Sequence, residues 1–350
     1  MAGTYFSVPF HVLTAYSPAS PPSYNLFYLA KVAVGLPQQV FELLLDTGSN
    51  VPWIYSSNCL TAQVCSVPDR YNHALSSTYV AVGNSFSASY YAGSISGVTS
   101  GDLWNLTVVN SPYSWVYFDK YAFGEITRSN WQPTSIANAN IDGFVGLTVP
   151  ASSSSGAVVP FFQMLVQRGY LASNLFAIDA ANARISFGNF NPSSSITWLP
   201  VLPYGAPGYY WWLVQLQDLL VNGVSTGACN QGQCLLMLDS GAGPLSVSNT
   251  LGNVAIPNSF PCSQAASLPQ ISFVVAGGRT FSFAGSDYSI SAGGACWSQV
   301  NQDPISNLVR TQRLGNATQA QTLLHLGAPW FQKVYTIHDA QNMRVGLNGY

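Results

Sequence analysis

The chain has 350 residues and a formal net charge of −2, and only 7% of its residues are charged, against about 25% in ordinary globular proteins. No block of like charge is present, so the composition gives no support to a nucleic-acid partner or to an anionic membrane surface. Aromatic residues reach 13% and Glu occurs only twice, which predicts a mostly β protein long enough for two lobes.

The low charge fits two interpretations, which we weigh equally. One is a secreted protein kept soluble by Ser, Asn, Gln and glycans, and Asn105 and Asn316 begin candidate glycosylation sites. The other is tolerance of acid, because few carboxylates lose their charge when the pH falls. The first residues, 1–6, do not read as a signal peptide, and no run approaches the about 20 apolar residues of a membrane span.

The chain contains six cysteines, which are Cys59, Cys65, Cys229, Cys234, Cys262 and Cys296. Six cysteines allow fifteen pairings, and the sequence alone does not choose among them. The close pairs are spaced too loosely for a redox motif, and no histidine stands beside them as a zinc ligand would. We therefore expect disulfides formed in an oxidising compartment, and no metal site.

In chain order, residues 5–45 alternate in short runs broken by prolines, which predicts the strands of a meander. The stretch Phe41–Asn50 ends this region with an uninterrupted apolar run followed by Asp46, Thr47 and Gly48. Such a run predicts a strand buried on both faces. A carboxylate carried out of a core in this way is costly to bury unless it is hydrogen-bonded or shares a proton.

Residues 85–98 alternate with period two around Gly93, which predicts a β-hairpin. The apolar–glycine segment 141–147 predicts a further strand. Residues 160–169 predict a helix, because Pro160 suits a first turn, the apolar spacing is helical, and Gly169 can end it.

The second half repeats the plan of the first. Residues 234–243 again give an apolar run followed by an aspartate, a hydroxyl residue and a glycine, here Asp239, Ser240 and Gly241. Each half also carries a later apolar–glycine strand, at 144–146 and at 325–327. We place the boundary in a serine-rich turn, with lobes at residues 1–194 and 195–350. Two halves of one plan predict a pseudo-twofold molecule with Asp46 and Asp239 meeting on its axis.

Two carboxylates held that close cannot both ionise cheaply, so the pair keeps one proton over a wide pH range. One carboxylate can then take a proton from water while the other donates one to a substrate carbonyl. This is general acid–base hydrolysis without a covalent intermediate. The alternative is that the two motifs are unrelated surface turns. It does not explain why both motifs follow buried strands.

With these motifs, the sequence resembles the pepsin-like aspartic proteases (family A1) over nearly its whole length. The matching motifs are Asp46-Thr-Gly-Ser49, Asp239-Ser-Gly241, Tyr90, Trp53, the segment 141–146 and the ending 334–347. The resemblance implies an all-β, bilobal fold with two barrel-like lobes, a few short helices and a catalytic cleft between them. It also implies three disulfides: Cys59–Cys65, Cys229–Cys234 and Cys262–Cys296.

The resemblance implies a role for each site residue. Asp46 and Asp239 would be catalytic, with Thr47, Gly48, Ser49, Ser240 and Gly241 supporting them. The hairpin would be a flap that closes over an extended peptide, and its substrate-binding residues would be Tyr90, Tyr91 and Gly93. The Trp53 indole N–H would donate a hydrogen bond to the Tyr90 hydroxyl. Without the motif context, core packing would be the better explanation for Tyr90 and Trp53. The histidines His11, His73, His325 and His338 are read as structural or exposed.

Three positions depart from the family pattern. Tyr91 puts a bulky residue in the flap, Ala242 replaces the usual hydroxyl donor to the second aspartate, and Ala328 stands where many members have Asp. The last two changes have opposing effects on the acidity of the second carboxylate. Renin-like members share both alanines and act at less acidic pH, so our hypothesis is a weakly acidic optimum.

The leading interpretation is a secreted or lumenal aspartic endopeptidase that cuts extended peptides between apolar residues and needs no cofactor. We expect a monomer that binds pepstatin-type inhibitors and is made as a zymogen with a basic propeptide. The alternative is a non-catalytic member that keeps the cleft as a binding or inhibitor surface. A third interpretation is a structural cell-surface β protein, which would not bind pepstatin.

Overall fold

The fold is taken from a computed structural model of the chain. It describes residues 5–350 apart from short stretches: 19–21, 61–64, 66, 68, 91–92, 110, 112–113, 132–139, 150–157, 194, 204–210, 230–232, 253, 302–309 and 315–316. The backbone alone is described at 248–249, 310–314 and 317–321.

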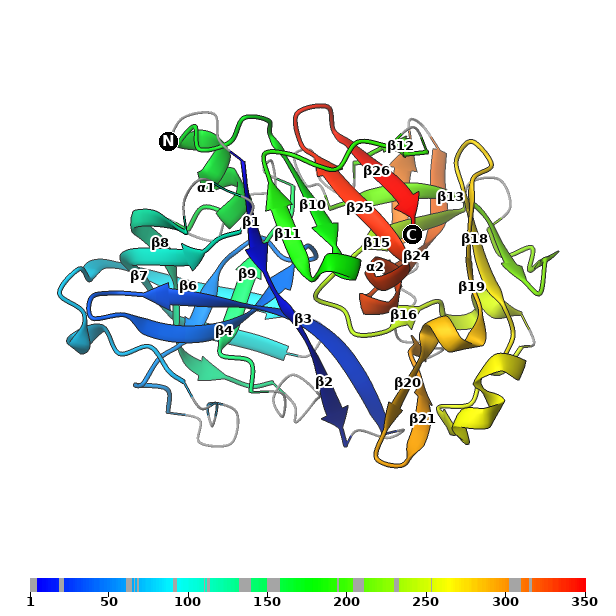
Figure 1. The fold of residues 1–350 in the computed structure, drawn as a ribbon, viewed down its shortest axis with the longest axis horizontal. Helices are drawn as coiled ribbons and strands as arrows, with labels where there is room; N and C mark the ends of the chain where they lie inside the picture. The colour runs from blue at the N-terminus through cyan, green and yellow to red at the C-terminus, as the bar shows by residue number, and fades with distance from the viewer. Residues whose placement is uncertain are drawn as a thin grey trace.

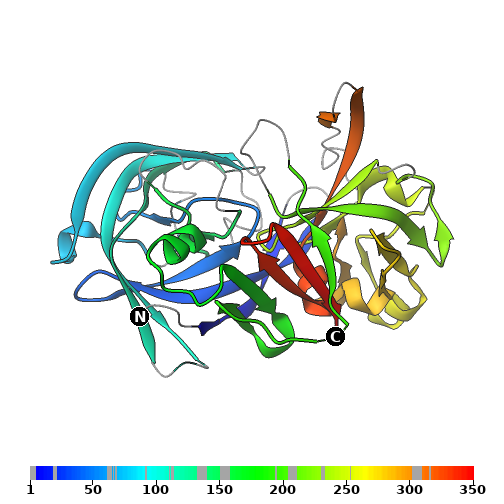
Figure 2. The ribbon, with the colours of Figure 1, turned by 90° about the horizontal axis from the view of Figure 1, so that it is seen from above.

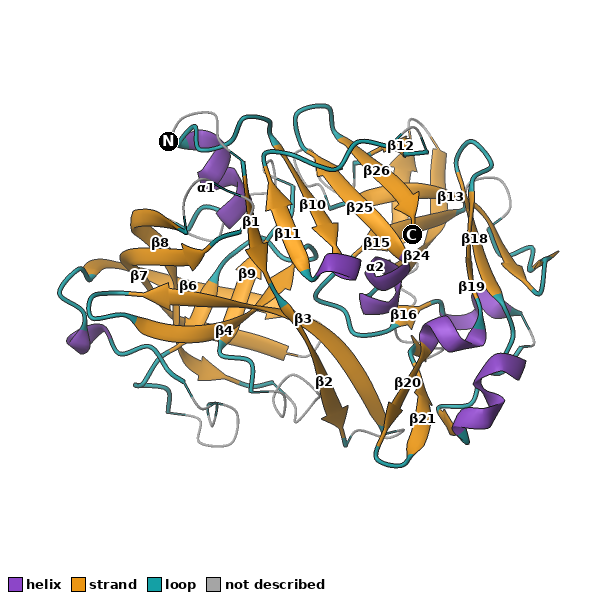
Figure 3. Ribbon diagram, in the orientation of Figure 1, coloured by secondary structure: helices purple, strands orange, loops and turns teal. Residues whose placement is uncertain are grey.

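Strands dominate the structure, and they gather into two lobes (Figures 1 and 3). Most of the first half forms one antiparallel-rich sheet. Its strands lie in the order β2 (His11–Ser17), β3 (Ser23–Val34), β4 (Gln39–Asp46), β9 (Gly143–Gly146), β5 (Trp53–Tyr55), β8 (Trp115–Ser129), β7 (Gly93–Thr107) and β6 (Val80–Tyr90). The expected hairpin around Gly93 is the β6–β7 pair, so this prediction is confirmed.

The second half builds a sheet of the same kind. Its strands lie in the order β19 (Thr280–Phe283), β18 (Ile271–Val275), β13 (Leu213–Val221), β15 (Cys234–Leu238), β24 (Ala317–Leu326), β16 (Leu245–Ser246) and β22 (Val300–Asn301), with β14 (Val224–Ser225) on β13 and β23 (Arg310–Leu314) on β24. A small sheet of β17 (Ser259–Phe260), β21 (Ala295–Ser298) and β20 (Ser289–Ala292) extends it. The mostly β, two-lobed architecture expected from the sequence is thus confirmed.

A six-stranded sheet lies between the lobes (Figure 2). Its order is β1 (Phe6–Pro9), β11 (Arg184–Phe187), β10 (Leu175–Asp179), β25 (Val334–Asp339), β26 (Arg344–Gly349) and β12 (Thr197–Pro200). The β10–β25 pair joins strands from the two halves of the chain. The predicted lobe boundary falls between β11 and β12, but residue 194 lies outside the described residues, so the boundary stays a prediction.

The interlobe sheet repeats one turn in both halves. Asp179 accepts hydrogen bonds from Asn182 and Arg184, and Asp339 does the same for the residues three and five positions later, Asn342 and Arg344. Both aspartates are buried, so these bonds satisfy carboxylates that would otherwise be costly to remove from water. The pseudo-twofold plan therefore extends beyond the two motifs that the sequence made obvious.

Helical segments are short. The α-helices are α1 (Phe161–Gln167) and α2 (Ala328–Lys333), and 3-10 turns occupy His73–Leu75, Ala180–Asn182, Ser248–Leu251, Cys262–Ser267 and Gly285–Tyr288. α1 confirms the helix predicted at 160–169: Pro160 is its N-cap, and Gly169 takes a positive φ of 66° just beyond its end. In the part of the chain that is described, no helix has the length and apolar character needed to cross a membrane.

Three disulfides close loops in the structure. They join Cys59 to Cys65, Cys229 to Cys234 and Cys262 to Cys296, which are the pairs that the family resemblance implied. The third bridge closes the longest loop, with a sequence separation of 34 residues.

His338 lies in the interlobe sheet and is fully buried, with its ring stacked 4.4 Å from that of Phe176. Neither ring nitrogen has a hydrogen-bond partner among the described residues, and burial lowers the pKa of His338 to about 3. The folded chain therefore keeps this ring neutral. The contribution of the neutral ring to the free energy of unfolding is fully present above the ordinary pKa of 6.5. It is lost progressively as the pH falls towards about 3.

We predict that His338→Leu makes the fold less sensitive to acid. The free energy of unfolding of the wild type should fall relative to the variant by up to roughly 1.4 kcal/mol per pH unit between about pH 6.5 and pH 3. Urea denaturation of both proteins at several pH values measures this difference in slope, which does not depend on any constant packing cost. Parallel stability curves would contradict the prediction.

Candidate active site

Asp46 and Asp239 occupy equivalent places at the ends of two buried strands. Asp46 ends β4, which runs parallel to β9, and Asp239 follows β15, which runs parallel to β24. In each lobe the aspartate lies beside the apolar–glycine strand that the sequence repeat predicted, so the two carboxylates leave their cores in the same way. Asp46 is 4% exposed, and the Asp239 side chain is 15% exposed.

The residues after the aspartates tie the two lobes together. The Thr47 backbone N–H donates to the Ser240 Oγ at 3.1 Å, and the Ser240 N–H donates to the Thr47 Oγ1 at 2.9 Å. Each hydroxyl then donates to the opposite lobe, Thr47 to the Leu238 carbonyl at 2.7 Å and Ser240 to the Leu45 carbonyl at 2.6 Å. Both side chains are fully buried, so each bond also satisfies a group that water cannot reach.

The glycines Gly48 and Gly241 allow the carboxylates to approach the opposite loop. The Gly48 N–H donates to its own lobe's Asp46 at 2.8 Å, and the Gly241 N–H donates to Asp239 at 3.0 Å. A Cβ on Gly48 would lie 2.5 Å from the Cγ of Asp239, and a Cβ on Gly241 equally close to the Cγ of Asp46. Any side chain at these positions would therefore push the two aspartates apart.

The electrostatics of the pair favour one shared proton. Burial raises the pKa of Asp46 well above its ordinary range, and the charge of Asp239 raises it further. The Gly48 amide and the Ser49 hydroxyl act in the opposite direction. Ser49 Oγ is buried, and no hydrogen bond of normal geometry to it is recorded among the described residues. Asp46 is thus the member that keeps its proton towards neutral pH.

Tyr90 ends β6, beside this pair. The Trp53 Nε1–H donates to the Tyr90 hydroxyl at 2.8 Å, and the tyrosine ring packs 5.4 Å from both Trp131 and Phe144. Burial, and secondly the nearby charge of Asp46, raise the pKa of Tyr90, so its hydroxyl stays protonated. Tyr91 lies outside the described residues. Gly93, at the start of β7, has a φ of 140°, and a Cβ there would crowd Trp131.

Other candidate residues take different places. Asp142 is buried and accepts the Glu42 backbone N–H at 2.8 Å, which agrees with a structural role. Asn105 lies within β7 between β3 and β8, and the oxygen of its side chain is buried. Asn316 lies outside the described residues, and glycosylation at both sites stays a prediction.

His325 is the site residue that sequence reasoning missed. It was read as structural or exposed, yet its Nδ1 lies 3.8 Å from Oδ2 of Asp239. The available signal was the internal repeat: residues 325–327 echo 144–146, and Phe144 is a neighbour of the first aspartate's strand. Pairing the repeats position by position would have placed His325 next to Asp239.

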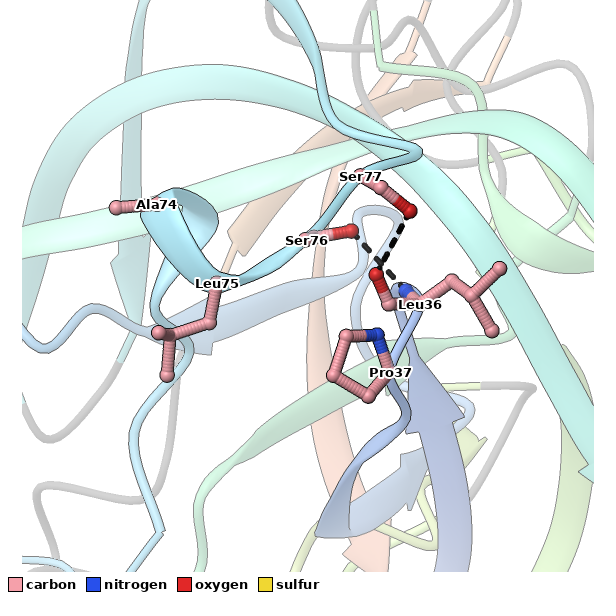
Figure 4. A pocket seen from close by; sticks show the side chains of 6 residues that line it. All are labelled: Leu36, Pro37, Ala74, Leu75, Ser76 and Ser77. Carbon is pink, nitrogen blue, oxygen red and sulfur yellow. Dashed lines mark hydrogen bonds between the residues drawn. The ribbon is translucent and has the colours of Figure 1, made fainter.

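A surface pocket lies away from these residues. It is lined by Leu36, Pro37 and residues 74–77, where the Ser76 and Ser77 hydroxyls bond the Leu36 backbone (Figure 4). None of its lining residues is ionisable. Across the described part of the chain, no three His, Cys, Asp or Glu side chains gather as a metal site requires.

Comparison with known proteins gives a family match. Residues 27–349 match the model of the family described as eukaryotic aspartyl protease. The chain is 28% identical to gastricsin of Mus musculus and 27% identical to gastricsin of Homo sapiens, each match covering 91% of this chain and 80% of the relative. It is 29% identical to cathepsin E-A of Xenopus laevis, over 91% of this chain and 78% of that protein.

We predict that Thr47→Val lowers the free energy of unfolding by about 2–4 kcal/mol, because it orphans the buried Ser240 N–H and Leu238 carbonyl. Thr47→Ser is the matched control: it keeps the hydroxyl and should cost about 1 kcal/mol or less. Urea denaturation measures both. If the two variants lost the same stability, the hydroxyl bonds would not be what holds the loops together.

Proposed function

Because the chain belongs to the eukaryotic aspartyl protease family, we propose that it is an aspartic endopeptidase whose acid–base pair is Asp46 and Asp239. The observation that carries the proposal is the reciprocal Thr47–Ser240 hydrogen bonding, which holds the two carboxylates against each other's loops. A pair of unrelated turns has no reason to be tied in this way.

In the proposed reaction the dyad carries one proton. The ionised carboxylate, Asp239, takes a proton from a water molecule as that water attacks the carbonyl carbon of the scissile peptide bond. Asp46, which holds its proton because of burial and its charged neighbour, donates to the carbonyl oxygen. In the second step Asp239, now protonated, donates to the leaving amine nitrogen as the C–N bond breaks. Asp46, now ionised, takes a proton back from a hydroxyl of the tetrahedral intermediate as the carbonyl reforms, so the dyad returns to its starting protonation.

We propose that the β6–β7 hairpin is the flap over this site. Tyr90 is held by the Trp53 indole and by aromatic neighbours, so its ring has a fixed position beside Asp46. An extended peptide bound between flap and dyad gains main-chain hydrogen bonds that do not depend on sequence. The aromatic surroundings of Tyr90 favour apolar residues flanking the scissile bond.

The proposal also covers the compartment in which the protein acts, its oligomeric state and its processing. Three disulfides and relatives named gastricsin support the secretory pathway. The site within one chain contains both aspartates, so a monomer suffices. Synthesis as a zymogen, and glycosylation at the two sequons, belong to the same proposal.

The decisive experiment measures cleavage of denatured haemoglobin or casein at about pH 3–6, with and without pepstatin. We expect pepstatin-sensitive cleavage, and loss of activity by at least about a thousandfold in Asp46→Asn and in Asp239→Asn. Both variants keep the size and shape of the aspartates, but an amide cannot take up or release a proton in this pH range. A folded wild type that cleaves nothing but binds pepstatin would instead be a non-catalytic binding protein.

A second prediction concerns the pH optimum, which we expect to be weakly acidic. Asp46 holds its proton towards neutral pH, so the productive singly protonated dyad persists there. Ala242→Thr adds a hydroxyl donor to ionised Asp239 and should move the acid limb of the kcat/KM profile to lower pH. A wild-type profile that peaks at about pH 2–3 would contradict this expectation.

A further inference from the structure

The one basic side chain paired with the dyad, among the described residues, is His325. Its strand β24 runs parallel to β15 with His325 opposite Met237, and the ladder continues through the Asp239 N–H, which donates to the Leu326 carbonyl at 3.1 Å. Residues two apart on a strand share a face of the sheet. Asp239 therefore lies on the same face as Met237 and His325, which brings Nδ1 to 3.8 Å from Oδ2.

The other lobe has no such group. The equivalent pair is Leu44 opposite Phe144, whose ring stacks 4.7 Å from that of Trp53. The repeated fold therefore needs only an apolar side chain at this place, and an imidazole is not explained by packing. The Nε2 of His325 is also buried without a hydrogen-bond partner among the described residues, which costs free energy that an apolar residue would not cost.

The same lobe lacks a side-chain hydroxyl three residues after its aspartate. Three residues after Asp46 stands Ser49, whereas three residues after Asp239 stands Ala242, which has no hydroxyl. The Gly241 N–H donates to Oδ1 of Asp239, and the His325 ring faces Oδ2. The 3.8 Å separation is too long for a direct hydrogen bond and lies within the range of an ion pair.

The remaining neighbours of His325 do not titrate. Met237 on β15, Ser246 on β16 and Leu323 on its own strand are the described residues beside it, and none carries a charge. Among the described residues, the recorded ion pair of the ring is with Asp239. The geometry therefore pairs His325 with the dyad through Asp239.

We propose that His325 is a positioning residue of the dyad, whose protonated ring keeps Asp239 ionised in place of the hydroxyl donor that Ala242 lacks. The inference rests on the proposed function, because it assigns a role within the same site. Its consequence is directional. A positive neighbour favours the ionised carboxylate, so it extends activity to lower pH than the dyad would reach alone.

The first test is independent of turnover. Ring resonances of the histidines are followed by NMR against pH in the wild type and in Asp239→Asn, with the His325 signals identified by their loss in His325→Gln. We expect the titration midpoint of His325 to move down by about half a pH unit in Asp239→Asn, the scale of a partly exposed ion pair. The exposed His11, which pairs with Glu42, should not move. An unchanged His325 midpoint would overturn the inference.

The second test reads the consequence in kcat/KM. His325→Leu should move the acid limb up by about half a pH unit, a roughly threefold loss on that limb. Adding Ala242→Ser to this variant should move the limb back, and His11→Leu is the control that removes a histidine elsewhere. If kcat/KM fell equally at every pH, or if Ala242→Ser did not restore the acid limb, His325 would have only a packing role and the inference would be overturned. Should the wild type prove inactive, the proposed function falls, while the ring titration still decides whether His325 and Asp239 are paired.

Discussion

The reciprocal hydrogen bonds between Thr47 and Ser240 are the interaction on which the site depends. Each residue donates its backbone N–H to the other's hydroxyl, and each hydroxyl donates to a carbonyl of the opposite lobe. Because both side chains are buried, no water can replace a lost partner. The lobes therefore have one low-energy arrangement at this point, and that arrangement fixes Asp46 and Asp239 against each other's glycine loops.

On this symmetric frame the chemistry is asymmetric. The first lobe surrounds its aspartate with Ser49 and an aromatic group around Phe144, whereas the second offers Ala242 and His325. Asp46 is also the more buried of the two, which favours its protonated form. The side chains around a repeated backbone thus give the two aspartates different environments.

The buried ionisable groups also bear on how the fold responds to acid. Burial raises the pKa of Asp142 from its ordinary value of 3.8 to about 7. The contribution of the protonated carboxyl to the free energy of unfolding is therefore full below pH 3.8 and is lost as the pH rises through about 7. His338 has the opposite dependence, because its depressed pKa opposes protonation at low pH. Of these two buried groups, His338 is therefore the one whose protonation opposes folding as the pH falls.

The sequence by itself determined the β class, the two-lobed plan and the aspartate pair, because all three depend on local patterns: alternation, apolar runs and a motif stated twice. It also determined the helix at 160–169 and the hairpin around Gly93, where a proline and glycines restrict the backbone. The remaining features of the site depend on which residues of distant strands lie opposite each other. Only the pairing of β15 with β24 brings His325 to Asp239, across 86 residues by number. Only the meeting of the lobes gives the Thr47 and Ser240 hydroxyls their partners, since a sequence motif does not specify which distant atoms it will touch.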